Sequence, residues 1–319
     1  MRNNVLLELL ILFKYGLFYS FATHSGCPEY SMLEPCSCIH RPGADILFCA
    51  GLKNLSVLDQ VLERSSNWTF DTLFVCQSNL QNIPSNSLEQ RMVKSVLVAS
   101  SNMTSLFDKE ADAAGNSVET LHINDVRFEN GISWNMIRSL RKLRHFNLQF
   151  GDVPVIGSEV AKSFAGGLKH LRMSNTRTKE IENGAFANLV ELTEIKIRHS
   201  EVAVLERSVF PKPAKLKLID FTSNQIESLP EDIFSDMPNL KYVYFGENKI
   251  SQLSSALLGY AMDNFVFLIL NGNPLNCDCV FKVLVEKDNQ IVDGNCVYPD
   301  DKKGLILANL TTEHFSTCS

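Results

Sequence analysis

The sequence lacks the features expected of a nucleic-acid-binding protein, a membrane-spanning protein or a common enzyme. With 30 basic and 36 acidic residues, its net charge of −6 provides no overall basic footprint for a nucleic acid. After residue 22, no apolar run reaches the roughly 18 residues that a membrane-spanning helix needs. The chain also has no H-E-x-x-H, no G-x-S-x-G, no phosphate-binding glycine loop and no EF-hand loop. We therefore expect a non-enzymatic protein without a metal or another cofactor.

Cysteine is scarce in the middle of the chain, where only Cys76 stands between Cys49 and Cys277. The other eight cysteines form two groups of four near the ends: Cys27, Cys36, Cys38 and Cys49, and Cys277, Cys279, Cys296 and Cys318. Zinc is the competing interpretation, but zinc ligands are usually spaced C-x(2–4)-C, and both groups contain the shorter C-x-C. We therefore expect two disulfide-bonded units, formed in an oxidising compartment. Four cysteines allow three pairings, so spacing alone leaves the connectivity open.

Residues 1–22 have the composition of a secretory signal peptide. Arg2 gives a basic start, Val5–Phe13 is mostly apolar, and Ser20 and Ala22 supply the small residues of a cleavage site. The alternative is an N-terminal membrane anchor, but Glu8 interrupts the apolar stretch. The signal peptide predicts a secreted, extracellular protein.

Apolar residues recur with a period of about 24 residues over 70–276. One unit reads Leu240, Val243, Phe245, Asn248, Ile250 and Leu253. We place the first residues of nine units at Phe70, Val93, Val118, Leu143, Leu168, Leu192, Leu216, Leu240 and Phe265. Counted from these starts, positions +3 and +5 of each unit are expected to point into a core shared between stacked units. A capping strand is expected before them, at 46–48.

The unit resembles the leucine-rich repeat signature L-x-x-L-x-L-x-x-N-x-L. That resemblance implies an α/β repeat solenoid shaped as a horseshoe, with a parallel β-sheet on the concave face and capping units at both ends. It also implies that asparagines at position +8 hydrogen-bond the backbone of neighbouring turns. Asn224, Asn248 and Asn273 hold this position in the later units, whereas Ser, Thr, Val or Gly holds it in the earlier ones.

The cysteine groups resemble the caps of extracellular leucine-rich repeat proteins. Asn273-Pro-Leu-Asn-Cys277-Asp-Cys279 is similar to the N-P-x-x-C-x-C opening of the C-terminal cap. The family pairs the first cysteine with the third and the second with the fourth. The resemblance therefore implies the pairs Cys27–Cys38, Cys36–Cys49, Cys277–Cys296 and Cys279–Cys318. The expected domains are a signal peptide at 1–22, an N-terminal cap with its strand at 23–69, repeats at 70–276 and a C-terminal cap at 277–319.

The N-terminal cap carries a narrower resemblance. Cys27-Pro-Glu29, followed by Leu33-Glu-Pro-Cys36-Ser-Cys38, is similar to arthropod proteins related to the non-catalytic subunit of shrimp (Oplophorus) luciferase. That subunit accompanies a separate catalytic chain. The resemblance implies a partner-binding or stabilising role and does not imply luciferase activity.

Positions +2, +4 and +6 of each unit are expected on the concave face, because side chains alternate along a strand. They predict an apolar strip from Leu218, Tyr242, Tyr244, Phe267 and Ile269, beside a basic strip from His170, Arg172, Lys196 and Arg198. Exposed apolar patches with polar rims usually mark interaction sites, so we expect a protein partner here. Two alternatives remain open: the C-terminal cap or a register error covers the apolar strip, and nearby Glu194 and Asp220 neutralise the basic strip.

Two smaller features carry their own alternatives. His145 and His170 occupy equivalent positions and lie close enough to bind a metal, but no third ligand is evident, which favours ordinary surface histidines. Alternation places Cys76 on the solvent side of its strand. It is either a shielded free thiol or the site of a disulfide-linked dimer.

Four Asn-x-Ser/Thr sequons predict glycosylation sites at Asn54, Asn67, Asn102 and Asn309. Three lie in the N-terminal third, where glycans would favour a binding site elsewhere. The sequence leaves three functions open: a secreted protein-binding module, a non-catalytic subunit of a secreted enzyme complex, and a structural component of the extracellular matrix.

Overall fold

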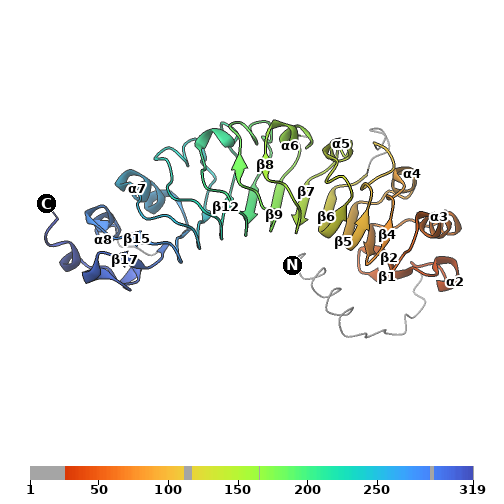
Figure 1. Ribbon diagram of the computed structural model, residues 1–319, viewed down its shortest axis with the longest axis horizontal. Helices are drawn as coiled ribbons and strands as arrows, with labels where there is room; N and C mark the ends of the chain where they lie inside the picture. Colours follow the sequence, from red (N-terminus) through yellow and green to blue (C-terminus); the bar gives the residue numbers. More distant parts are fainter. Residues whose placement is uncertain (1–25, 111–116, 165, 288–290, 319) are drawn as a thin grey trace.

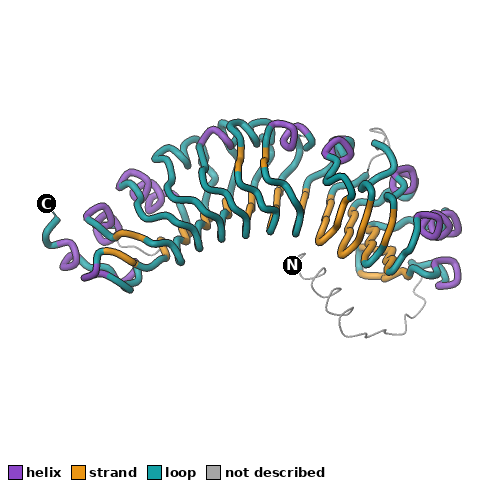
Figure 2. The backbone as a smooth tube through the Cα atoms, in the orientation of Figure 1, coloured by secondary structure: helices purple, strands orange, loops and turns teal. Residues whose placement is uncertain are grey.

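The computed structural model describes residues 26–110, 117–164, 166–287 and 291–318, which form one curved solenoid (Figure 1). The strands line the inner side of the arc, and the short helices and loops lie on its outer side (Figure 2). The predicted signal peptide lies outside the described residues. No helix among the described residues has the length and apolar character to cross a membrane.

A 13-stranded sheet runs along the whole concave side. Its strands are β1 (Ser37–Arg41), β2 (Ala44–Ala50), β3 (Thr72–Cys76), β4 (Asn79–Leu80), β5 (Ser95–Met103), β6 (Thr120–Phe128), β7 (His145–Gln149), β9 (His170–Ser174), β11 (Glu194–Arg198), β12 (Leu218–Asp220), β13 (Tyr242–Tyr244), β14 (Phe267–Ile269) and β16 (Val292–Asp293). Neighbouring repeat strands pair in parallel, and each begins two residues after the predicted start of its unit. The predicted leucine-rich repeat solenoid is therefore confirmed.

Alternation within each strand separates the core from the concave face. In β9, Leu171 and Met173 are buried, while the residues between them are half-buried on the opposite side. The next turn stacks Ile195 on Leu171 and Ile197 on Met173, so the inward side chains of successive units form one continuous core. A single unit cannot bury this apolar face by itself, and the stacked neighbouring units cover it.

The convex side is built from short elements. The helices are α2 (Tyr30–Leu33), α3 (Leu55–Arg64), α4 (Ser85–Gln90), α5 (Trp134–Arg138), α6 (Ser158–Lys162), α7 (Ser255–Asn264) and α8 (Lys282–Glu286), with 3-10 turns at Arg207–Val209, Cys279–Phe281, Asp300–Lys302, Leu307–Asn309 and Thr312–Phe315. Two small sheets pair β8 (Val155–Ile156) with β10 (Glu180–Ile181), and β15 (Leu275–Asn276) with β17 (Cys296–Tyr298). Because the strands repeat on one side and these elements on the other, the solenoid curves toward the sheet.

A ladder of asparagine side chains joins the later turns. Asn248 accepts a hydrogen bond from the Ile226 amide at 3.0 Å and donates to the carbonyls of Phe221 and Phe245 at 2.9 and 3.0 Å. In four of the six earlier turns a hydroxyl occupies the position, as where Ser78 accepts from the Leu52 amide at 3.1 Å. These bonds satisfy backbone groups that the tight turn removes from water.

A disulfide-bonded cap closes each end of the solenoid. The bonded pairs are Cys27–Cys38, Cys36–Cys49, Cys277–Cys296 and Cys279–Cys318, the same pairs that the family resemblance implies. At the N-terminal end, β2 contains the capping strand that we expected at 46–48, and β1 pairs with it in antiparallel fashion, so the cap is a hairpin. At the C-terminal end, β16 pairs with β14 and extends the sheet by one strand.

Candidate functional site on the concave face

Strand register organises the concave face between β9 and β14 into two rows of side chains. The first row is His170, Glu194, Leu218, Tyr242 and Phe267. The second row is Arg172, Lys196, Asp220, Tyr244 and Ile269. All nine residues predicted for partner binding lie on these five adjacent strands, with Arg198 one position further along β11. The face thus divides into a charged half on β9, β11 and β12, and an apolar half on β12, β13 and β14.

The apolar half, which we call the aromatic strip, consists of Leu218, Tyr242, Tyr244, Phe267 and Ile269. Tyr242 and Phe267 are 37% and 45% exposed, and their rings stack with centroids 6.1 Å apart. The cap strand β16 lies beside β14 in the sheet, where Asp293 is the neighbour of Ile269. The cap therefore continues the face and leaves the rings of Tyr242 and Phe267 accessible.

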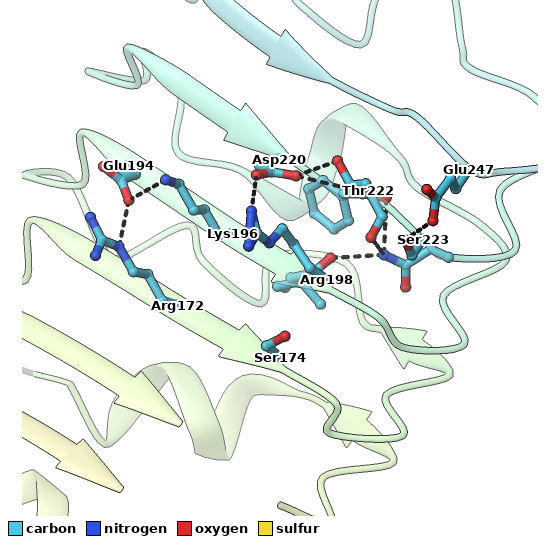
Figure 3. Close-up of polar contacts among 12 residues, drawn as sticks. Arg172, Ser174, Glu194, Lys196, Arg198, Asp220, Thr222, Ser223 and Glu247 are labelled. Atoms are coloured by element: carbon cyan, nitrogen blue, oxygen red, sulfur yellow. Dashed lines mark hydrogen bonds and ion pairs between the residues drawn. The ribbon is translucent and has the colours of Figure 1, made fainter. Parts of the chain in front are cut away.

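The charged half, which we call the charged strip, contains Arg172, Glu194, Lys196, Arg198 and Asp220 (Figure 3). Glu194 meets the guanidinium of Arg172 at 2.6 Å and the ammonium of Lys196 at 3.2 Å. Arg198 meets Asp220 at 3.2 Å. All three cations therefore have a carboxylate partner, as the alternative interpretation of the basic strip anticipated. The strip is a zwitterionic network with three cations and two carboxylates, and not a free basic surface.

Electrostatics hold this network in its charged form. Burial raises the pKa of Glu194, but the hydrogen bond and charge of Arg172 and the charge of Lys196 outweigh it and lower the pKa below its ordinary value. Asp220 is almost fully buried and also accepts hydrogen bonds from the amide and hydroxyl of Thr222 at 3.1 and 2.7 Å. Burial, followed by the charge of Asp220, raises the pKa of Tyr244. The boundary between the two strips is thus preorganised by fixed partners.

Histidines occupy the concave face next to the charged strip. The Nδ1 atoms of His145 and His170 are 3.0 Å apart, and Nδ1 of His122 lies 3.4 Å from the side-chain amide of Asn147. Burial lowers the pKa of His170, and burial together with Arg172 lowers the pKa of His122 to about 4. Among the residues that the structure describes, no group of three or more His, Cys, Asp or Glu side chains is arranged to hold a metal ion.

The concave face at the N-terminal end has a feature that our sequence analysis missed. Ile46, Phe74, Cys76 and Ala99 form a small buried apolar cluster, separate from the main core, with Phe48 and Leu97 packed against it. Cys76 is therefore a free thiol that is only 5% exposed, in line with the first alternative of a shielded thiol, although alternation alone suggested a side chain facing solvent. Burial raises the pKa of Cys76 to about 11, which disfavours the reactive thiolate. Comparing positions +4 and +6 in the first two units with the capping strand before them would have revealed this cluster.

The four predicted glycosylation sites are all exposed. Asn54 also caps α3, since its side-chain oxygen accepts a hydrogen bond from the Val57 amide at 3.3 Å. That oxygen is not the atom that carries an N-linked glycan, so capping leaves the amide nitrogen available. Glycosylation itself stays a prediction.

Comparison with known proteins agrees with this architecture. The family described as BspA type leucine rich repeat region matches residues 130–262, in 6 copies. No curated protein matches the chain. Among solved structures, a chain of the octameric complex of Latrophilin 3 (Lec, Olf), Unc5D (Ig, Ig2, TSP1) and FLRT2 (LRR) superposes with a TM-score of 0.54 at 16% identity, over 77% of this chain and 90% of that chain. At that identity the likeness concerns the fold alone. The repeat pattern, the continuous parallel sheet and the two disulfide caps together give this chain the fold of a leucine-rich repeat solenoid with a cysteine cap at each end.

Proposed function

We propose that this protein is a secreted, non-enzymatic module that binds a protein partner through the concave face of β9–β14. The observation that carries the proposal is the exposure of Tyr242 and Phe267 in adjacent strands of an otherwise well-packed sheet. Water-exposed aromatic rings in one contiguous strip raise the free energy of the unbound protein, and covering them lowers it. Tyr is also among the residues enriched at energetic hot spots of protein interfaces.

The charged strip gives this surface an orientation. It borders the aromatic strip at β12, where Leu218 and Asp220 lie in the same strand. An apolar centre with a polar border is the usual anatomy of an interface, in which the charges mainly set register and association rate. Because its carboxylates are already paired, the strip presents fixed donors and acceptors and requires little rearrangement when a partner binds.

The secreted location rests on three features of the chain. These are the composition of residues 1–22, the four disulfides and the four exposed sequons. Disulfides of this kind persist in oxidising compartments. The FLRT2 leucine-rich repeat chain that this fold resembles belongs to a multi-protein complex. A partner for this chain is consistent with that precedent.

The test combines substitution with partner capture. The wild type and the double variant Tyr242→Ala with Tyr244→Ala are each used to capture proteins from the native extracellular fluid. Mass spectrometry then identifies the proteins that each one retains. Tyr298→Ala is the matched control, because Tyr298 is an exposed tyrosine of the C-terminal cap, away from the concave strips. We expect the double variant to lose the recurring partner at unchanged melting temperature, and the control to keep it. If the wild type, the double variant and the control all retain the partner equally, the concave-face proposal is refuted.

A second candidate is a non-catalytic subunit that stabilises a secreted enzyme. The resemblance of the N-terminal cap, around Cys27 and Cys36–Cys38, to relatives of the luciferase subunit favours it. This candidate predicts one partner chain at constant stoichiometry, with the catalytic activity residing in that chain. A structural role in the extracellular matrix instead predicts that the capture experiment retains mainly further copies of this chain. A dimer that a reductant dissociates would assign this self-association to Cys76.

A further inference from the structure

A second surface lies along the edge of the sheet at which the strands end, away from the concave strips. Each repeat unit places a side chain there at position +9. In four consecutive units these residues are Arg127, Asp152, Arg177 and Glu201, which we call the edge ladder. All four are exposed, and their charges alternate in sign along the solenoid. The units on either side carry the uncharged amides Asn102 and Gln225 at this position.

Most charges of the edge ladder are not neutralised within the chain. Among the described residues, Arg127, Asp152 and Arg177 take part in no ion pair that the structure contains. Glu201 approaches Lys179 at 3.7 Å, but both side chains are exposed, and such pairs contribute little. The ladder therefore offers its charges to a partner.

An open hollow of about 780 Å³ lies beside the ladder, and the four ladder residues line it. Its apolar lining includes Phe128 and Ile132. The hollow forms where the turns separate: pairing of β6 with β7 ends at Asn124 opposite Gln149, whereas pairing of β5 with β6 continues to Met103 opposite Phe128. The repeat thus leaves space at this edge for side chains from outside.

Phe150 stands at this hollow and is 57% exposed. Its backbone is left-handed, with φ of 55°, at the turn that Asp125, Asn175 and His199 also adopt in neighbouring units. A bulky aromatic residue is uncommon in this conformation and is normally found there only when the surroundings or a function demand it. An exposed aromatic ring at the centre of a charged edge has the composition of an interface core.

We propose that a second copy of this chain docks on this edge, related by a two-fold axis that passes between Asp152 and Arg177. A two-fold axis lying across the ladder reverses its order in the partner, so each position faces its mirror position. Asp152 then faces Arg177 of the second copy, and Arg127 faces Glu201. Read in reverse, the sequence of charges is therefore fully complementary to itself. Stacked turns are about 4.8 Å apart in both copies, so the spacings match as well.

The neighbouring positions fit the same axis. Asp125 of one copy faces His199 of the other, and Phe150 faces Asn175, so the two Phe150 rings lie next to each other across the axis, where the two hollows face each other. Apolar contact at the centre and four ion pairs around it follow the arrangement of a symmetric interface. The surface is distinct from the aromatic strip, so dimerisation leaves the proposed partner-binding face open.

The first experiment measures self-association by sedimentation velocity of the purified, disulfide-intact chain over a concentration series. Every protein carries Asn102→Gln, because Asn102 pairs with Arg127 in the register of β5 and β6 and a glycan there would stand against the ladder. We expect a reversible dimer that weakens as salt is raised, since exposed ion pairs are screened. A non-reducing gel excludes a covalent dimer through Cys76. A chain that remains monomeric throughout the series would overturn the proposal.

Charge reversal then tests the axis. Asp152→Arg and Arg177→Asp each place two pairs of like charges across the interface, and we expect each to raise the dissociation constant by about 10-fold or more. The doubly reversed chain restores both pairs and should dimerise as the parent does. An equal mixture of the two single variants should form a heterodimer, because the reversed charges of the two chains then face each other with opposite sign, and so do the two remaining native charges. Mixed variants that stay monomeric would refute the two-fold arrangement.

Lys249→Asp is the matched control. Lys249 occupies position +9 two units beyond Glu201, is exposed, and undergoes the same change of charge outside the ladder. We expect its dissociation constant to equal that of the parent, and circular dichroism should show all variants folded. A dimer that persists in Arg177→Asp but disappears in Tyr242→Ala with Phe267→Ala would place self-association on the concave face and overturn the proposal.

Discussion

Removing one side chain of the asparagine ladder, which consists of Asn224, Asn248 and Asn273, tests how the repeat is stabilised. In Asn248→Ala the amide of Ile226 loses its acceptor, which lies 3.0 Å away, and the carbonyl of Gly246 loses a donor at 3.1 Å. Asn248 is 6% exposed, so water does not readily replace these bonds. A buried donor left without a partner costs roughly 1–3 kcal/mol, and the weakened carbonyl bonds add to it. We therefore expect Asn248→Ala to lower the free energy of unfolding by about 2–4 kcal/mol.

The assay is urea unfolding followed by far-UV circular dichroism, together with hydrogen exchange of the Ile226 amide. Lys249→Ala, a change at the exposed neighbour, should cost less than about 0.5 kcal/mol. A loss below that value for Asn248→Ala, or an Ile226 amide that stays protected, would refute the reasoning.

The same ladder predicts coupling between rungs. The carbonyl of Phe221 accepts from Asn224 at 3.0 Å and from Asn248 at 2.9 Å. Either single substitution leaves this carbonyl one donor, and the double substitution leaves it none. The loss in the Asn224→Ala, Asn248→Ala double variant should therefore exceed the sum of the single losses. Simple additivity would mean that the two rungs act independently.

Three further predictions follow from single side chains. Burial first, and then Arg172 and His145, lower the pKa of His122 from 6.5 to about 4, so the unfolded chain binds a proton that the folded chain does not. The free energy of unfolding should therefore fall as the pH drops from 6.5 to about 4. In His122→Gln the midpoint of urea unfolding should fall less steeply over this pH range, and an unchanged pH dependence would contradict the prediction. Because burial raises the pKa of Cys76 to about 11, iodoacetamide should label Cys76 slowly in the folded protein and rapidly in denaturant, and prompt labelling of the folded chain would argue otherwise. Phe150→Gly should raise monomer stability by about 0.5–1 kcal/mol, because glycine adopts a left-handed backbone without a Cβ clash; thermal denaturation that shows no gain would count against strain at this turn.

The repeat architecture was predictable because its signals are local and recur many times. The alternation of Leu171 and Met173 with polar neighbours already separates core from surface, and nine such units set a common register. The N-terminal hairpin was not predictable in the same way, because pairing of β1 with β2 depends on the cap as a whole. Positions on the concave face were also readable, since strand alternation assigns them directly.

The properties of those concave side chains were less accessible. Sequence analysis left open whether Glu194 and Asp220 neutralise the cations; the structure pairs Glu194 with Arg172 and Lys196. Alternation placed Cys76 on the correct side of β3 but gave the wrong exposure, because burial depends on the neighbours Ile46, Phe74 and Ala99 from three different turns.

By itself, therefore, the sequence determined the repeat, its register, the core positions and the two cysteine-rich ends. These follow from periodicity and spacing, which are properties of the chain read in order. Only the tertiary structure decided which concave groups are paired, that Cys76 is buried, and that the hollow and the exposed Phe150 lie beside the alternating charges of the edge ladder. Most of these are relations between residues more than 20 positions apart, which the stacking of turns brings together. Stacking distances and solvent exposure exist only in the folded solenoid.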